Sequence, residues 1–361
     1  MWDASWYDSI AVLGYSTHTP ISGYFNSISI SGYKLILPHW GNYTNVAFFP
    51  LYPAIVGLIM AATRSTSVYA FITPAITFYF ASIFAFAKLA RLYLDDTQSR
   101  LSTMLYAVYP GAIFCVAAYP TSLINFLVII SLYFMARQKY FYAATFSGIA
   151  TAAGPLSVFV SAIIIINYFK NNDINIKNFY KFSILSILSV SGVSLFSMFL
   201  LYKFGDPLLF VDAQNAWGVL PIIDRIKSFV TLHPVFGGGY YDFFKSLIFQ
   251  ENISKSGIIK SFEFVVNGAT IIYSIYIIMR SLKVYEKTQL YYCAAVIAYY
   301  CWSIGTIQGP IATSRLLYIC IPLFIASAKV INHRGLVVIL VLSMIILVFQ
   351  CAFFISGGPV L

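Results

Sequence analysis

The residues best suited to chemistry lie at the amino terminus, in the run Trp2-Asp3-Ala4-Ser5-Trp6-Tyr7-Asp8. An aspartate beside aromatic rings at a membrane surface is partly desolvated, which raises its basicity and suits it to work as a general base. The alternative for Asp3 is a solvated or helix-capping carboxylate. Asp3 and Asp8 are five positions apart and so point about 140° away from each other around a helix, which argues against a carboxylate pair.

The same run is expected to form a helix that lies in the membrane interface. One stripe of the helical wheel holds Trp2, Trp6, Ser9, Ile10 and Leu13. Spacings of three and four residues between apolar positions indicate an amphipathic helix. Residues 1–47 are therefore interpreted as a polar and aromatic lead-in that carries an interfacial helix on the extracytoplasmic face.

A second motif, Phe48-Phe49-Pro50-Leu51-Tyr52-Pro53, opens the first apolar segment. Its two prolines prevent a helix from starting before Pro50 and hold the chain rigid at that point. Phe49 and Tyr52 could then form an aromatic mouth near Asp3. The alternative is that these rings only anchor the helix at the interface.

Composition places these motifs in a membrane protein. Sixty per cent of the 361 residues are hydrophobic and 9% are charged, a balance that a water-soluble domain could not bury. Most apolar segments approach the 20 or so residues needed to cross a bilayer. They lie at 49–64, 68–92, 101–118, 121–136, 141–168, 180–203, 262–282, 289–304, 314–330 and 336–356. We therefore expect an all-α, polytopic membrane protein with about ten membrane helices in a single domain, 1–361.

Basic residues predict the orientation of the chain, since they gather in cytoplasmic loops. They fall in five short connections that hold Lys88, Arg91 and Arg100; Arg137 and Lys139; Lys170, Lys177 and Lys181; Arg280, Lys283 and Lys287; Lys329 and Arg334. All five share one face if segment 141–168 is broken near Gly154-Pro155. The opposite face then holds a long loop at 204–261, which could include interfacial helices. One of the segments 49–64 and 68–92 must be re-entrant or interfacial.

The distribution of charge and the spacing of metal-binding residue types argue against a nucleic-acid-binding protein and against a metal site. The net charge of +10 is spread over these loops rather than gathered in one patch, so no nucleic-acid partner is expected. The four histidines are isolated and the five cysteines have no ligand spacing, so no metal site is expected.

The two motifs together resemble those of the PIG-V-like mannosyltransferases, which are membrane glycosyltransferases of the GT-C class. The resemblance rests on Trp2-Asp3-Ala4, on Ile10-Ala11 with Gly14-Tyr15, and on Asn45 to Pro53. Weaker matches follow in the same order. They are Tyr119-Pro120-Thr121-Ser122-Leu123, Phe204-Gly205-Asp206-Pro207-Leu208, Ala213-Gln214, Trp217, and Arg315 before Pro322-Leu323-Phe324.

The resemblance implies a GT-C-like fold and an inverting transfer of a hexose, mannose in the family, from a polyprenyl-phosphate donor. The acceptor would be a lipid, glycan or protein on the extracytoplasmic face. The membrane would be the plasma membrane in a prokaryote or the endoplasmic reticulum in a eukaryote. Asp3 would be the catalytic base and Arg315 would bind the donor phosphate. Further substrate-binding candidates are Trp2, Tyr7, Phe49, Tyr52, Tyr119, Asp206, Gln214 and Trp217. No cofactor is required, and a divalent ion between Asp3 and the phosphate is left open.

The chain departs from the family pattern in three places. Thr121 stands where the family carries an acidic residue, and Ala152-Ala153-Gly154-Pro155 stands where it carries an arginine. Met1 directly precedes Trp2, whereas family members begin with a membrane helix, so we expect either that the start site is assigned too late or that the chain is truncated. Two alternatives stay open: a catalytically silent relative that binds lipid-linked glycan, and a transporter or flippase.

Overall fold

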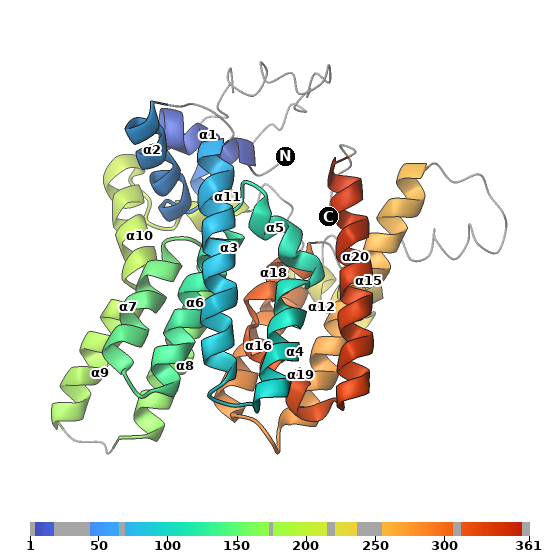
Figure 1. The fold of residues 1–361 in the computed structure, drawn as a ribbon. Coiled ribbons are helices and arrows are strands. Elements are labelled where there is room, and N and C mark those ends of the chain that lie inside the picture. Colours follow the sequence, from blue (N-terminus) through green and yellow to red (C-terminus); the bar gives the residue numbers. More distant parts are fainter. Residues whose placement is uncertain are drawn as a thin grey trace.

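The computed structural model describes residues 4–17, 44–64, 69–172, 176–214, 221–236, 255–305 and 312–355. Every regular element within these ranges is a helix, which confirms the all-α prediction. The helices form an upright bundle, with short helices laid across one end (Figure 1).

One group of helices comes mainly from the first half of the chain. Its members are α1 (Ala4–Leu13), η2 (Asn45–Ala47), α2 (Leu51–Thr63), α3 (Tyr69–Ala90), α6 (Thr121–Ala136), α7 (Tyr140–Thr151), η4 (Pro155–Ser157), α8 (Val158–Lys170), α9 (Ile176–Ser189), α10 (Ser191–Phe204) and α11 (Leu209–Ala213). Helix α6 packs between α3 and α7, so it lies at the centre of this group.

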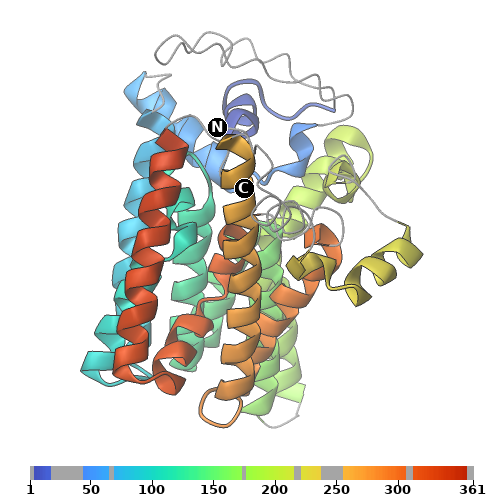
Figure 2. The ribbon, with the colours of Figure 1, turned by 90° about the vertical axis from the view of Figure 1, so that its right-hand side faces the viewer.

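The second group packs against the first through α3, α6 and α8. Its members are α4 (Asp96–Ala107), η3 (Pro110–Ala112), α5 (Ile113–Val116), α12 (Ile222–Val230), α13 (His233–Phe236), α15 (Lys255–Ser281), α16 (Lys287–Tyr300), the π-helical turn η6 (Cys301–Gly305), α18 (Thr313–Leu316), η7 (Leu317–Ile319), α19 (Pro322–Val330) and α20 (His333–Ile355). Figure 2 shows α20 and α15 standing side by side at the edge of this group.

Tyr106 on α4 is at the centre of the packing between helices. Its ring is fully buried and stacks on Phe86 of α3, with 4.8 Å between the ring centres. Its hydroxyl donates to Ser82 Oγ on α3 at 2.8 Å, and its carbonyl accepts from the Tyr318 hydroxyl of η7 at 2.6 Å. Buried phenols need such partners because an unpaired polar group is costly in an apolar interior.

The predicted break near Gly154-Pro155 is confirmed. Helix α7 ends at Thr151, and α8 begins at Val158 after the single turn η4. Pro155 lacks an N–H, and Gly154 is extended at φ −174°, so the helical hydrogen bonds stop here. The carbonyl of Ala152 accepts a hydrogen bond of 2.9 Å from the Leu51 N–H instead. The break therefore also fixes the start of α2.

The expectation of about ten membrane helices is not confirmed. Three helices, α3, α15 and α20, are long and apolar enough to cross a membrane, and up to six spans result if three bent helix pairs are counted. Breaks at proline account for part of the difference, because they divide some long apolar runs into short helices. The 12 residues of α7, for example, span only about 18 Å.

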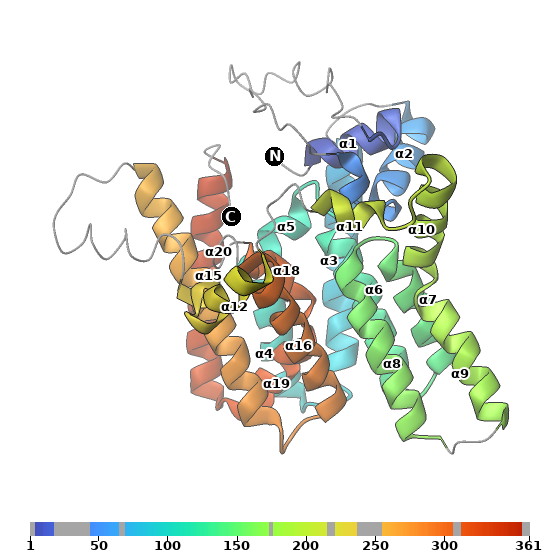
Figure 3. The ribbon, with the colours of Figure 1, turned by 180° about the vertical axis from the view of Figure 1, so that it is seen from behind.

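The five basic connections all lie at one end of the bundle (Figure 1, bottom), which we call the inner end. Helices α1 and α2 lie at the opposite, outer end, and Figure 3 shows the same arrangement from behind. Helix α2 stays beside α1 at this end while α3 runs the length of the bundle. Of the two segments, 49–64 is therefore the one that does not run the length of the bundle, as a re-entrant or interfacial segment would not.

The predicted loop at 204–261 contains helices wherever the structure describes it. Helices α11, α12 and α13 lie between Phe204 and Phe236, and α13 contacts α15 and η6. Helix α15 already begins at Lys255, so the loop is shorter at its carboxyl end than expected. The hydrophilic residues before 262 obscured this start, because they form the polar first turns of a helix whose later turns are apolar.

Two glycines allow α7 to approach the junction of α9 and α10 closely. A Cβ on Gly148 would lie 2.1 Å from the Leu188 carbonyl oxygen, and one on Gly192 would lie 2.3 Å from the Gly148 carbonyl oxygen. Both obstacles are backbone atoms, which cannot move aside as a flexible side chain can. Small residues at helix contacts of this kind let two backbones meet.

We expect Gly148→Ala to destabilise the protein by about 1–3 kcal/mol, because the added methyl group must push two helices apart. The matched control is Gly57→Ala in α2, where the nearest atom to a new Cβ is 3.7 Å away. That change should be neutral or stabilising, since alanine favours the helix. Thermal unfolding in detergent, followed by a thiol-reactive dye that reads the buried cysteines, measures both. Equal melting temperatures for the two variants would contradict the close approach.

Candidate functional site

Helix α1 is held at the outer end by the fully buried side chain of Asn45. Its amide nitrogen donates to Ser9 Oγ and to the Gly14 carbonyl oxygen, each at 3.0 Å, and its oxygen accepts from the Ser16 N–H at 2.9 Å. One amide therefore satisfies polar groups in the helix and in the chain that leaves it. Gly14 lies in the left-handed region at φ +76°, where glycine is favoured, and this directs the chain back toward Asn45.

Aromatic rings form the contact between α1 and the start of α2. Trp6 stacks on Phe48 with 5.8 Å between ring centres, and Tyr7 meets the rings of Phe48 and Tyr52 edge-on at 5.2 and 5.6 Å. The Tyr52 hydroxyl donates to the Phe71 carbonyl oxygen of α3 at 2.7 Å. Tyr7 and Tyr52, both predicted substrate-binding residues, are thus brought together, although both are largely buried.

A second aromatic cluster joins the same segment to α10 and α11. Phe49 contacts Phe196 of α10 and Phe210 of α11, with ring centres 5.1 and 5.4 Å apart. Gln214, just after α11, donates from its amide to the Ala47 carbonyl oxygen at 3.1 Å. Phe49 and Gln214 therefore lie close together, from positions 165 residues apart in the chain.

Asp206 has a local structural role in the described geometry. Its carboxylate accepts from the Leu208 N–H at 2.8 Å and closes the turn between α10 and α11. This turn follows Gly205, which ends α10 at φ +80°. The contact orients α11 and, through it, Gln214.

Arg315, on α18, and Tyr119, between α5 and α6, form a separate group. The guanidinium carbon of Arg315 lies 5.4 Å from the ring centres of both Phe114 and Tyr119, within the range of cation–π attraction. The two rings meet edge-on at 5.5 Å. Gly111 places this group, because a Cβ there would lie 2.3 Å from the Ser314 carbonyl oxygen.

The amino-terminal end of α1 points from α2 toward the middle of the molecule, above the region of α5 and α18 (Figures 1 and 3). Ala4, its first residue, is 1% exposed and belongs to the same apolar cluster as Tyr7 and Tyr52. Trp2, Asp3 and Trp217, which the sequence predicts in the site, lie outside the described residues.

The described part of the chain holds no group of three His, Cys, Asp or Glu side chains suited to a metal ion. A divalent ion between Asp3 and a phosphate stays open, since Asp3 lies outside the described residues. Thr121, at the position of the missing acid, is the first residue of α6 and is buried. The adjacent Ser122 hydroxyl is also buried and has no hydrogen-bond partner among the described residues.

Sequence reasoning missed two residues of this region, Asp8 and Asn45. The Asp8 side chain is buried, 7% exposed, with no hydrogen bond or ion pair to a described residue. Burial raises the pKa of its carboxyl group to about 6. Within the predicted interfacial stripe, Ser9 and Ile10 are buried and Leu13 is 68% exposed, and Asp8, outside the stripe, also faces inward. The polar Asn45 directly before Val46-Ala47-Phe48-Phe49 was the one signal available for the buried amide.

No model of a known protein family matches the chain, and no curated protein is significantly similar to it. The resemblance to the PIG-V-like mannosyltransferases therefore stays a prediction that depends on the motifs themselves.

The Asp8 carboxylate makes stability depend on pH. Because its folded pKa of about 6 lies above the ordinary aspartate value of 3.8, the charged form is penalised in the folded state. This penalty is absent below pH 4, develops as pH rises through 6, and is complete above that. We expect Asp8→Asn to be more stable than the parent by roughly 1–2 kcal/mol at pH 7.5, with a gain that disappears near pH 4.

Thermal melting of both proteins in detergent between pH 4 and 8 measures this effect. The control is Asp212→Asn, an exposed carboxylate at the same end, whose difference from the parent should be small at every pH. A gain for Asp8→Asn that does not vary with pH would argue against a buried, titrating carboxylate.

Proposed function

We propose that this chain is a membrane glycosyltransferase that moves a hexose from a polyprenyl phosphate to an acceptor hydroxyl at the outer end of the bundle. The observation that supports this most is the placement of the motif residues. All seven predicted site residues within the described ranges, Tyr7, Phe49, Tyr52, Tyr119, Asp206, Gln214 and Arg315, come from elements away from the five basic connections. That is the arrangement needed by an enzyme whose loops face the cytoplasm and whose substrates meet on the other face.

The reaction needs a base, a group that binds the leaving phosphate, and positioning. Asp3, one residue before α1, takes the proton of the acceptor hydroxyl as its oxygen attacks the anomeric carbon. The bond between that carbon and the phosphate oxygen breaks, and the electron pair leaves with the polyprenyl phosphate. Arg315 offers a planar fork of N–H donors for the phosphate. Attack opposite the leaving group inverts the configuration of the sugar.

The rings of Phe114 and Tyr119 prepare Arg315 for this role. They pack against the guanidinium group by cation–π contact and restrict its rotamers, so less conformational freedom is lost when a phosphate binds. The Asn45 amide plays the corresponding part for α1, because it fixes the helix that directly follows Asp3. We place the protein across a membrane, in the plasma membrane of a prokaryote or the endoplasmic reticulum of a eukaryote, with the broken helices completing further crossings.

Asp3→Asn should reduce sugar transfer by a factor of about 10²–10⁴, the usual contribution of a general base. Membranes that contain the full chain receive radiolabelled polyprenyl-phosphate mannose, and label is followed into lipid, glycan and protein. Asp96→Asn, the same change in an exposed residue at the inner end, should retain full transfer. Undiminished transfer by Asp3→Asn would remove that residue as the base. Donor binding without transfer by the unmodified chain would instead favour the silent relative suggested by Thr121.

Arg315→Lys should raise KM for the donor by about tenfold, because an ammonium retains the charge and loses the two-point fit to phosphate. Arg315→Gln should have a larger effect, and both variants should melt within a few degrees of the parent. The control is Arg64→Lys, an exposed arginine at the carboxyl end of α2. If Arg315→Lys lowers the melting temperature and leaves donor KM unchanged, the arginine is structural.

A further inference from the structure

A cavity of about 470 Å³ lies at the inner end, far along the bundle from α1 and α2. It is formed where α7, α8 and α9 come together and is lined by Gln138, Tyr140, Phe141, Tyr168, Asn171, Asn172, Lys181, Ile184 and Leu185. Its volume is in the range of small-molecule and headgroup sites. None of these residues belongs to the proposed transferase site.

The polar wall of this cavity is fixed by hydrogen bonds before any ligand arrives. The Asn171 amide donates to the Tyr140 hydroxyl at 2.9 Å and to Asn167 Oδ1 at 2.7 Å, and Tyr140 itself donates to Asn167 Oδ1 at 3.0 Å. Tyr140 and Tyr168 meet edge-on at 5.2 Å, and both are at least nine-tenths buried. Such a wall keeps its shape, which lowers the entropy lost on binding.

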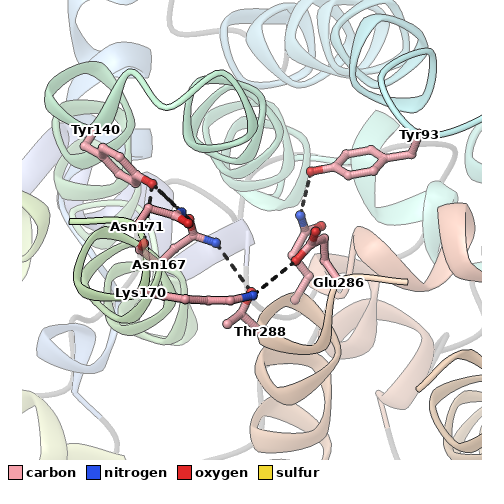
Figure 4. A network of polar contacts seen from close by, with 8 residues as sticks. Tyr93, Tyr140, Asn167, Lys170, Asn171, Glu286 and Thr288 are labelled. Carbon is pink, nitrogen blue, oxygen red and sulfur yellow. Dashed lines mark hydrogen bonds and ion pairs between the residues drawn. The ribbon is translucent and has the colours of Figure 1, made fainter. Parts of the chain in front are cut away.

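The network continues across to the second group of helices, as Figure 4 shows. Asn167 donates to Thr288 Oγ1 at 3.5 Å, and Lys170 lies 3.9 Å from the Glu286 carboxylate. Glu286, the acidic residue of this network, is therefore already paired with Lys170. The lysine that lines the cavity, Lys181, is exposed and has no ion pair with a described residue.

The charges around the cavity favour an anion. Lys181 of α9 and Gln138, in the turn between α6 and α7, present an ammonium and an amide as hydrogen-bond donors. Arg137 and Lys139 flank Gln138 in the same turn, and both are exposed. No acidic residue is among the described residues that line the cavity.

The rim of the cavity is apolar and exposed. Phe141 of α7 is 60% exposed and Ile184 of α9 is 38% exposed. A ligand that places an anion against Lys181 could therefore lay a hydrocarbon chain along these two side chains. A soluble anion would gain nothing from this part of the surface, whereas a lipid would bury apolar area there.

We propose that this cavity binds the phosphate head group of an anionic phospholipid, with Lys181 and Gln138 against the phosphate and the acyl chains along Phe141 and Ile184. The basic inner end corresponds to the cytoplasmic face, where anionic lipids gather and basic pockets between helices bind their head groups. Because the lipid contacts α7, α8 and α9, it stabilises the packing of three helices far from the transferase site. The inference goes beyond sugar transfer and does not depend on it.

Native mass spectrometry of the full chain in detergent tests this assignment, with phosphatidylglycerol and phosphatidylcholine as probes. Phosphatidylglycerol should be retained at least fivefold better than phosphatidylcholine. Lys181→Gln should lower its retention about fivefold, the effect of one lysine near a lipid surface. The matched control, Lys283→Gln, removes the same charge from an exposed position at the inner end outside the cavity, and should change retention less than twofold.

A second variant tests the cavity independently of charge. Ile184→Trp fills the rim with a larger ring and should lower phosphatidylglycerol retention at least threefold, while the melting temperature without lipid stays within a few degrees of the parent. Equal losses of phosphatidylglycerol retention for Lys181→Gln and Lys283→Gln would indicate general attraction by the basic inner end and would overturn the site. Displacement of the lipid by equimolar glycerol 3-phosphate would also overturn it, since the site would then take a soluble phosphate.

Discussion

The fold depends on one requirement, that backbone polar groups buried among apolar side chains must find partners inside the protein. The hydrogen bond from the Leu51 N–H to the Ala152 carbonyl oxygen meets this requirement at the most consequential position. Pro155 interrupts the helix and frees that carbonyl, and the first N–H of α2 would otherwise also lack a partner. Two incomplete helix ends thus satisfy each other, and Leu51 and Ala152, 101 positions apart, become neighbours.

The arrangement of the outer end follows from this bond. Because α2 starts against the break between α7 and α8, Phe49 is directed toward α10 and Tyr52 toward α3. Helix α1 then packs against the aromatic residues just before α2, and Asn45 holds the carboxyl-terminal end of α1. The short helices of this end are therefore positioned by packing and by the side-chain amides of Asn45 and Gln214.

Much of the fold could be predicted from the sequence, because a long apolar run locally favours a helix and a proline locally interrupts one. Segment 121–136 coincides with α6, and the break near Gly154-Pro155 lies where it was expected. The number of spans could not be predicted, since an apolar run looks the same whether it is one helix or two. The burial of Asp8 was equally hidden. A helical wheel ranks faces by their own hydrophobicity, whereas the face of α1 that turns inward is set by Phe48 and Tyr52, which come from a distant segment.

Ion pairs contribute little to the stability of this protein. Its charged residues are therefore free to differ between the two ends of the bundle. Two ion pairs join described residues, Lys170 with Glu286 and Lys227 with Asp224, and all four side chains are substantially exposed. Exposed pairs of this kind contribute at most about 1 kcal/mol each. Most basic residues of the inner end therefore have no acid to neutralise them within the described chain, so their field acts on what surrounds the protein. A stable core built from apolar contacts and amides allows the same sequence to keep its basic connections at the inner end and its aromatic clusters at the outer end.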